Sequence, residues 1–404
     1  MIPRVAFFAD CFHEVNGVAH TSRQFDAFVR RRALPFLNVH AGPRTESVED
    51  GPVWTLDLQR GKTGFSLEKD LSFDLLFLRY RHRVTEVLKR FGADLVHITG
   101  PNDVGMLGAL VAHDLHLPLV ASWHTNIHEF GAQRLSNALS FLPSGARRNI
   151  AAFTEQRIIL PLCLRYYQLA RVLLAPNPEL VELLHRRTGR PTFPMQRGVD
   201  TELFSPRKRT RDGGELVIGY VGRLSPEKDV RTLRDVERAM LAAGLNNFRF
   251  LIVGDGHERE WLRTNLQRAE LTGPLRGEEL ARAYANMDIF AFPSHTDTYG
   301  NVVLEALASG VPVVVTSNGG PKYLVSHGVT GLVSENSESF SQNVVRLAQD
   351  RNALEGMQAI AREFALTRHW HRIFEKVYEA YEYCLRERCP ATLRQPPAAQ
   401  RTCA

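Results

Sequence analysis

The chain has 404 residues, of which 44% are hydrophobic and 23% are charged. This length is enough for two domains of ordinary size, and the composition is that of a globular protein. No apolar run approaches the roughly 20 residues that span a bilayer, and the short apolar start before Asp10 is a poor signal peptide, so we expect a cytoplasmic protein. The five cysteines are scattered, which argues against a disulfide framework and against a zinc site.

The net charge of +6 is concentrated in the first half of the chain. Basic clusters lie there at Arg30–Arg32, Arg79–Arg83 and Arg147–Arg148. Such clusters attract phosphate-bearing partners, so we expect an anionic lipid surface as a partner and a peripheral position on the inner face of the cell membrane. Solvated helix faces explain the same residues equally well. A nucleic-acid partner is not expected, because the clusters lack interleaved aromatic residues. The oligomeric state does not follow from the sequence.

Strands and helices alternate through the first half of the chain. The predicted elements, in order, are a strand at 4–10, a helix at 18–31, a strand at 94–99, a helix at 104–116, a strand at 117–124, a helix at 149–160, a strand at 171–175 and a helix at 180–187. The polar, basic and irregular stretch 197–211 comes next and is typical of a hinge.

The same alternation restarts beyond the hinge. Its predicted elements are a strand at 215–221, a helix at 230–243, a strand at 248–253, helices at 258–267 and 278–286, a strand at 288–292, a helix at 302–308 and a strand at 312–316. Two such sets predict an α/β fold of two doubly wound domains that face each other, with ligands at the carboxyl ends of the strands. A last helix at 370–386 has an apolar face that would pack back across the domains.

These patterns give a domain plan for the whole chain. We predict a first Rossmann-like domain at 1–196 on the acceptor side, a hinge at 197–212, a second domain at 213–366 that binds the donor, a returning helix at 367–389 and a disordered tail at 390–404.

The segment Phe292–Thr316 is the most informative part of the sequence. It places Asp297 and Glu305 eight residues apart, across a glycine turn that opens a short helix. If Gly300 or Asn301 begins that helix, its first N–H groups are unpaired and lie between the two acids, where they could bind a phosphate beside sugar hydroxyls. This layout suits a sugar-nucleotide enzyme. The alternative is an ordinary helix and strand with two solvated acids.

Two further candidate residues follow strands of the first half. Gly17 opens a helix directly after the first strand, so its bare amide can approach a phosphate closely, although the surrounding residues do not form the GxGxxG fingerprint of dinucleotide-binding proteins. His124 closes an apolar strand, where its ring or backbone would lie against a reacting sugar. A tight turn at Gly17 and a structural histidine at 124 are the alternatives.

The second half offers a basic pair and two loops. Arg223 ends a strand and Lys228 follows five residues later, which suits a pyrophosphate leaving group because its charge grows as its bond to the sugar breaks. An ion pair of Lys228 with acidic neighbours in the loop is the alternative. The strand-end loops Val253–His257 and Leu271–Arg276 could form a slot for a nucleotide base.

A set of motifs in the same order resembles that of retaining glycosyltransferases of family four, which have the GT-B architecture. The motifs are NGV, SWHTN, GVD, VGRLSPEK, VGDG, TGPL, FPS, TDTYGNVVLEALASGVPVV and GGP, and the resemblance covers about residues 4–385. Within the family, the chain is most similar to bacterial GDP-mannose-dependent mannosyltransferases that act on phosphatidylinositol-type or other glycolipids, and to sulfoquinovosyl diacylglycerol synthases.

The resemblance implies a role for each matched residue. Arg223 and Lys228 would hold the donor diphosphate, Gly17 would approach it from the first domain, Glu305 would bind the ribose, and His124 would lie beside the reacting carbon. The turn that meets phosphate and sugar would comprise Thr298, Tyr299, Gly300 and Asn301.

The chain departs from the family pattern at two positions. Asp297 stands where the family usually has a glutamate, and Lys322 follows GGP where an acidic or neutral residue is commoner. Aspartate is one methylene shorter, so it would meet different hexose hydroxyls.

The predicted function is retaining transfer of a hexose, most simply mannose, from a nucleotide diphosphate sugar to a hydroxyl acceptor such as a membrane glycolipid. His124, Asp297, Arg223 and Lys228 would carry the catalysis. No cofactor beyond the donor is expected, and no metal, because the basic pair would neutralise the diphosphate. The alternatives are a UDP-sugar-dependent glucosyl- or sulfoquinovosyltransferase, a GT-B nucleotide-sugar 2-epimerase, and a nucleotide-binding protein without activity.

Overall fold

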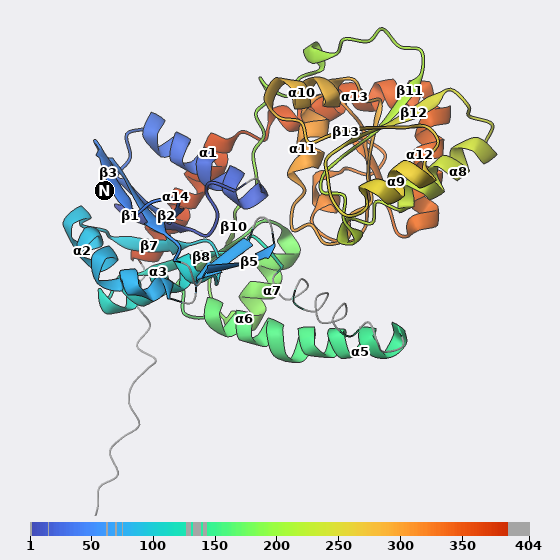
Figure 1. Ribbon diagram of the computed structural model, residues 1–404. Helices are drawn as coiled ribbons and strands as arrows, with labels where there is room; N and C mark the ends of the chain where they lie inside the picture. Colours follow the sequence, from blue (N-terminus) through green and yellow to red (C-terminus); the bar gives the residue numbers. More distant parts are fainter. Residues whose placement is uncertain are drawn as a thin grey trace, which may run out of the picture.

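The computed structural model contains two separate mainly parallel sheets, each covered by helices (Figure 1). It describes residues 2–14, 16–61, 64–68, 71–74, 76–126 and 144–386, together with the single residues 131 and 139. The predicted tail at 390–404 lies outside these residues.

The first sheet has the strand order β10-β9-β8-β7-β1-β2-β4-β3 and is parallel except at β3, which runs antiparallel to β4. Its strands are β1 (Val5–Ala9), β2 (Phe36–Gly42), β3 (Glu46–Asp50), β4 (Val53–Gln59), β7 (Leu95–Ile98), β8 (Leu119–Ser122), β9 (Val172–Ala175) and β10 (Thr192–Pro194). β5 (Gly64–Glu68) and β6 (Leu71–Asp74) form a separate two-stranded ribbon. Strands β1, β7, β8 and β9 are buried along their whole length, as expected for a sheet with helices on both faces.

The helices of the first domain are α1 (Gly17–Arg31), α2 (Arg81–Phe91), α3 (Asp103–Asp114), α5 (Ser144–Thr154), α6 (Leu160–Tyr167) and α7 (Pro178–Thr188). Helices α1, α3 and α7 each begin after an asparagine whose side chain accepts a hydrogen bond from the first turn. α5 and α6, joined by a π-helical turn at Glu155–Ile159, extend as a long arm that is green in Figure 1.

The second sheet has the order β13-β12-β11-β14-β15-β16 and is parallel throughout. Its strands are β11 (Leu216–Val221), β12 (Phe248–Val253), β13 (Ala269–Gly273), β14 (Ile289–Phe292), β15 (Val313–Thr316) and β16 (Gly331–Ser334). Its helices are α8 (Thr232–Ala242), α9 (Arg259–Asn265), α10 (Gly277–Ala285), α11 (Asn301–Ala308), α12 (Ser337–Gln349) and α13 (Arg351–Leu366).

The last helix, α14 (Trp370–Arg386), returns to the first domain, where it is the red helix among blue elements in Figure 1. Phe374 stacks on Phe25 of α1 with ring centroids 4.4 Å apart, and the helix joins the core beneath the first sheet. The predicted architecture of two doubly wound domains with a returning helix is therefore confirmed. The exact domain boundaries stay a prediction.

The chain passes between the domains twice, at two segments that touch. The amide of Val199 donates to the carbonyl of Arg368 over 3.0 Å. A Cβ at Gly198 would come within 2.6 Å of the Trp370 backbone nitrogen, so this contact requires glycine.

Several elements between residues 32 and 93 escaped the sequence analysis. β2 and β4 are buried strands, but Asn38, His40 and Asp57 interrupt their apolar pattern. These polar side chains are themselves buried, so alternation of apolar and polar residues was a poor guide there.

Candidate functional site

Predicted site residues from both domains meet at the start of α11. A Cβ at Gly17 would lie 3.2 Å from Asn301 Nδ2, so the first residue of α1 touches the first residue of α11. Thr298 Oγ1 donates to the carbonyl of His124 over 2.9 Å, and the carbonyl of Thr298 accepts from Asn177 Nδ2 over 2.7 Å. The TDTYGN turn therefore binds directly to strand-end loops of the first domain.

Lys228 and Asp297 form an ion pair within the second domain. Lys228 Nζ lies 2.8 Å from Asp297 Oδ2, and both side chains are mostly buried. The alternative given in the sequence analysis was an ion pair between Lys228 and acidic residues of its own loop. In the structure Lys228 is instead paired with Asp297, the first acid of the Asp297–Glu305 motif. Arg223 is more exposed and has its Nη1 4.0 Å from Glu227 Oε1. A bound diphosphate would compete with Asp297 for the lysine.

Close backbone contacts hold these loops at the carboxyl edge of the second sheet. Gly254 has a φ of +139°, and a Cβ there would lie 1.9 Å from the carbonyl oxygen of Gly222, directly before Arg223. The amide of Gly254 donates to the carbonyl of Gly273 over 3.0 Å. The two loops predicted as a base slot are therefore neighbours.

The helix α11 begins as the sequence predicts. Gly300 precedes it with a φ of +97°, a conformation that favours glycine, and no side chain in the described residues caps the helix. Its first N–H groups point out of the helix end that Gly17 and Thr298 border, which is the geometry of an anion site.

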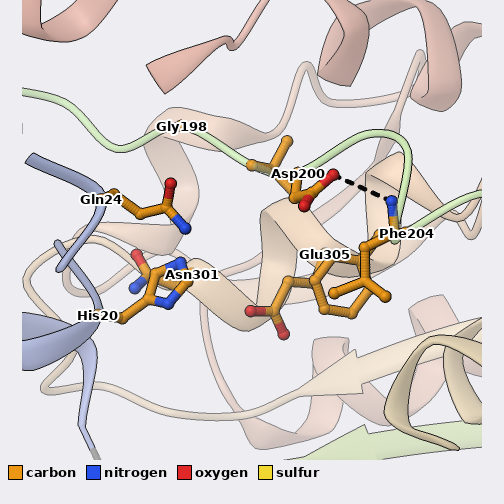
Figure 2. A pocket seen from close by; sticks show the side chains of 9 residues that line it. His20, Gln24, Gly198, Asp200, Phe204, Asn301 and Glu305 are labelled. Carbon is orange, nitrogen blue, oxygen red and sulfur yellow. Dashed lines mark hydrogen bonds between the residues drawn. The ribbon is translucent and has the colours of Figure 1, made fainter. Parts of the chain in front are cut away.

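A cavity of about 70 Å³ lies between the domains and is lined by residues of α1, the connecting segment 198–204 and α11. Figure 2 shows the carboxylate of Glu305 directed into it, with His20 and Gln24 of α1 on the opposite side. Small-molecule sites usually enclose about 300–1,000 Å³, so this cavity has room for only part of a nucleotide sugar. Binding of a whole donor therefore requires space outside the cavity or separation of the domains.

Glu305 has an unusual protonation behaviour in this setting. Burial raises the pKa of Glu305 to about 7, although the hydrogen bond from the Tyr284 hydroxyl, at 2.8 Å, acts in the opposite direction. The carboxyl group is therefore partly protonated near neutral pH, when no ligand is bound.

We expect this shift to make stability depend on pH. Between pH 4.5, the ordinary value, and about 7, the folded state keeps a proton on Glu305 that the unfolded chain releases. The free energy of unfolding therefore falls as pH rises through this window. Replacing Glu305 with Gln should flatten the slope, as measured by urea unfolding at several pH values. Glu338→Gln, at an exposed position, is the control; an equal change in both variants would contradict the assignment.

His124 is the end of a buried chain of hydrogen bonds that reaches α14. Its Nδ1 lies 2.5 Å from Arg197 Nη2 and its Nε2 lies 2.8 Å from Ser122 Oγ. Ser122 Oγ lies 2.9 Å from Nε2 of His97, whose Nδ1 is 2.6 Å from the Tyr381 hydroxyl. All five side chains are buried.

The two hydrogen bonds of the His124 ring have a definite direction. Burial keeps the pKa of His124 well below its usual value, and burial lowers the pKa of His97 to about 3, so both rings are neutral. Arg197 is only a donor, although burial lowers its pKa to about 10. His124 Nδ1 must accept from it, so His124 Nε2–H donates to Ser122 Oγ. The Ser122 hydroxyl then has two acceptors within reach, His97 Nε2 and the carbonyl of Ile98 at 3.5 Å.

The ring of His124 is therefore satisfied by protein groups at both nitrogens. Of this chain, the sequence analysis selected only His124 and missed the partners that fix its orientation. An arginine directly before the GVD motif, where the chain leaves the first domain, was the available signal for Arg197.

Several basic residues predicted to attract phosphate are paired with acids. Arg30 bonds to Asp26 and Asp50, and Arg32 bonds to Glu375. Likewise, Arg79 and Arg81 pair with acids from nearby elements. These clusters therefore carry less net charge than the sequence suggested.

Lys322, the second departure from the family pattern, has a specific partner. Its Nζ lies 3.3 Å from Glu179 Oε2 of α7, and the hydroxyl of Tyr323 donates to the same oxygen over 3.1 Å. Lys322 therefore forms an ion pair with Glu179, an acidic residue of the first domain.

Comparison with known proteins extends these observations. Residues 42–203 match the family model described as Glycosyltransferase Family 4, and residues 215–350 match Glycosyl transferases group 1. A GDP-mannose-dependent alpha-mannosyltransferase of Mycobacterium tuberculosis is 33% identical over 74% of this chain and 75% of its own length. The chain belongs to glycosyltransferase family 4. The enzyme is therefore a hexosyltransferase, as the motifs predicted.

Other matches agree with this assignment. A GDP-mannose-dependent alpha-(1-6)-phosphatidylinositol monomannoside mannosyltransferase of Mycobacterium tuberculosis is 32% identical to this chain. The match covers 43% of this chain and 50% of the relative's own length. The solved structure of sucrose-phosphate synthase from Thermosynechococcus elongatus superposes with a TM-score of 0.69 and 18% identity, over 94% of this chain and 98% of that one. The predicted GT-B fold is confirmed.

Proposed function

We propose that this glycosyltransferase moves mannose from GDP-mannose to a hydroxyl group of a membrane glycolipid, with retention at the anomeric carbon. The observation that carries the donor site is the meeting of Gly17, the uncapped start of α11 and the Lys228–Asp297 pair. The donor and acceptor classes rest on the names of the relatives at 32–33% identity.

In the proposed reaction, Arg223, Lys228 and the first amides of α11 hold the donor diphosphate. Asp297 orients hexose hydroxyls, and Glu305 binds the ribose. The bond between the anomeric carbon and the diphosphate breaks as the acceptor oxygen attacks from the same face. The departing phosphate oxygen takes the acceptor proton, so the products are a glycoside and a nucleoside diphosphate. Contact between the domains excludes water, which otherwise competes as acceptor.

A donor panel tests this proposal. Purified enzyme is incubated with GDP-mannose, UDP-glucose or UDP-sulfoquinovose and with extracted membrane lipids, and the products are analysed by mass spectrometry. Of the three donors, we expect only GDP-mannose to yield a lipid that has gained one hexose. Products only with a UDP-sugar would overturn the choice of donor, and an epimerised nucleotide sugar formed without acceptor would overturn transfer itself.

The arm formed by α5 and α6 suits contact with a lipid surface. None of the helices in the described part of the chain has the length and hydropathy of a membrane span. The arm nevertheless exposes Ile150, Phe153, Ile158 and Leu162, with exposed fractions of 41–68%. A π-helical turn takes one more residue than an α-helical turn. The turn at Glu155–Ile159 therefore brings Ile158 and Leu162 onto the helix face that carries Ile150 and Phe153.

We expect the double variant Phe153→Ser, Leu162→Ser to lose most co-sedimentation with anionic vesicles. Each apolar side chain contributes roughly 1.5 kcal/mol when buried in lipid, or about tenfold in partition per residue. Ile360→Ser, at a 42% exposed position of α13, is the control for lost surface hydrophobicity. Equal sedimentation of the double variant and the control would contradict contact through the arm.

A further inference from the structure

A cluster of metal-ligating side chains lies in the first domain, apart from the donor-site residues. His13, His40 and Asp57 each place one ligand atom within 4.8 Å of the others. His13 follows β1, whereas His40 and Asp57 lie toward the carboxyl ends of β2 and β4. In the part of the chain that the structure describes, this is the one such group of three.

His40 is the residue that calls for an explanation. It is 1% exposed, and its Nε2 has no hydrogen-bond partner among the described residues. Its Nδ1 lies 2.7 Å from Asp57 Oδ1, which is its one partner in the part of the chain that the structure describes. Buried polar side chains nearly always have a partner, because an unsatisfied one costs about 1–3 kcal/mol. A bound cation would take the nitrogen lone pair that no protein donor reaches.

The surroundings fix two of the three side chains. β2 and β4 are parallel neighbours whose register places His40 opposite Asp57. The ring of Phe12 stacks on that of His40 with centroids 4.1 Å apart and an interplanar angle of 10°. A Cβ at Gly42 would come 2.2 Å from Asp57 Oδ1, so only glycine leaves room for the carboxylate there. Such prior ordering lowers the cost of binding a ligand.

His13 completes the group from the solvent side. Its Nε2 lies 3.2 Å from Asp57 Oδ1, and its side chain is 47% exposed. The cluster is thus closed by Phe12 and Gly42 on the inside and open toward His13. An ion here would keep access to water or to an exogenous ligand.

We propose that His13, His40 and Asp57 bind a divalent transition-metal ion of the Zn²⁺ class. Two imidazoles and one carboxylate form a donor set that such ions favour, and three protein ligands leave one coordination position open. The inference goes beyond the proposed function, which uses no metal at the donor. The ion would also tie the β1–α1 turn to the sheet, at the opposite end from Gly17.

Cobalt binding tests the site without reference to activity. Full-length protein without a histidine tag is titrated with Co²⁺, and the visible absorption of low-coordinate cobalt is recorded. We expect one equivalent to bind, Zn²⁺ to displace it, and Zn²⁺ to raise the melting temperature. His13→Ala and Asp57→Asn should each weaken binding at least about tenfold, by comparison with losses seen for altered metal sites.

His113→Ala is the matched control, because His113 is 87% exposed and, in the described part of the chain, belongs to no group of three ligand atoms. It should bind cobalt like the wild-type protein. Circular dichroism establishes that each variant is folded; His13 is half-exposed in a loop, so its removal should leave the fold intact. Wild-type protein that binds no more cobalt than folded His13→Ala would overturn the proposal, as would an equal loss in His113→Ala.

Discussion

Replacing Lys228 with Met is expected to lower kcat about 10²- to 10³-fold, the cost of losing one preorganised group that stabilises developing charge. Methionine keeps most of the length of the side chain and removes only the ammonium group. Loss of the ammonium group also leaves Asp297 without the partner that lay at 2.8 Å, so the unpaired carboxylate of Asp297 would face the negatively charged diphosphate. Calorimetry with the nucleoside diphosphate should show weaker binding, and steady-state kinetics should show the loss in kcat.

Two comparisons make this result specific. Lys208→Met removes another paired lysine of the second domain, which bonds to Glu278, and should leave both measurements unchanged. The double variant Lys228→Met, Asp297→Asn separates two roles of Asp297, which are to hold Lys228 in place and to orient hexose hydroxyls. If Asp297 acts only by holding the lysine, the double variant loses no more activity than the single one. Unchanged nucleotide binding in Lys228→Met would overturn the donor-site assignment.

Replacing Tyr381 with Phe should lower the free energy of unfolding by about 1–3 kcal/mol, because the buried Nδ1 of His97 then loses its hydrogen-bond partner. Tyr378 is the matched control on the same helix. Its hydroxyl is buried and has no hydrogen-bond partner among the described residues, so Tyr378→Phe should be neutral or slightly stabilising. Urea unfolding of the two variants measures the difference.

The same pair of variants tests whether the chain of bonds positions His124. Loosening of His97 and Ser122 would let the His124 ring move, and misplacement of a site group lowers kcat more than it changes KM. We therefore expect Tyr381→Phe, but not Tyr378→Phe, to lower kcat. Equal stability of the two variants would contradict a stabilising hydrogen bond between Tyr381 and His97.

The sequence was sufficient where one residue type answers one physical need. A glycine with positive φ before α11, buried β-branched strands and an apolar face on the last helix all predicted their local structure correctly. Two repeats of strand and helix predicted two facing doubly wound domains, and the resemblance to family four added the GT-B architecture.

The sequence failed where a side chain's meaning depends on a distant partner. His40 and Asp57 are 17 positions apart and meet only because β2 and β4 are neighbours. Tyr381 appeared as one residue of an apolar helix face, although its hydroxyl bonds to His97 in the first sheet. Lys228 was expected at the phosphate, but its pairing with Asp297 depends on the fold of the second domain.

The two adjacent crossings between the domains restrict how the enzyme can open. A single interdomain segment would let one domain rotate about any axis relative to the other. Here two segments are joined by the hydrogen bond between Val199 and Arg368, so rotation is easiest about the axis that passes through both. We expect the far ends of the domains to swing through a wide arc while Gly198 and Trp370 scarcely separate. Spectroscopic labels placed beside the crossings should then report a nearly constant distance, and labels on α5 and α9 a broad one.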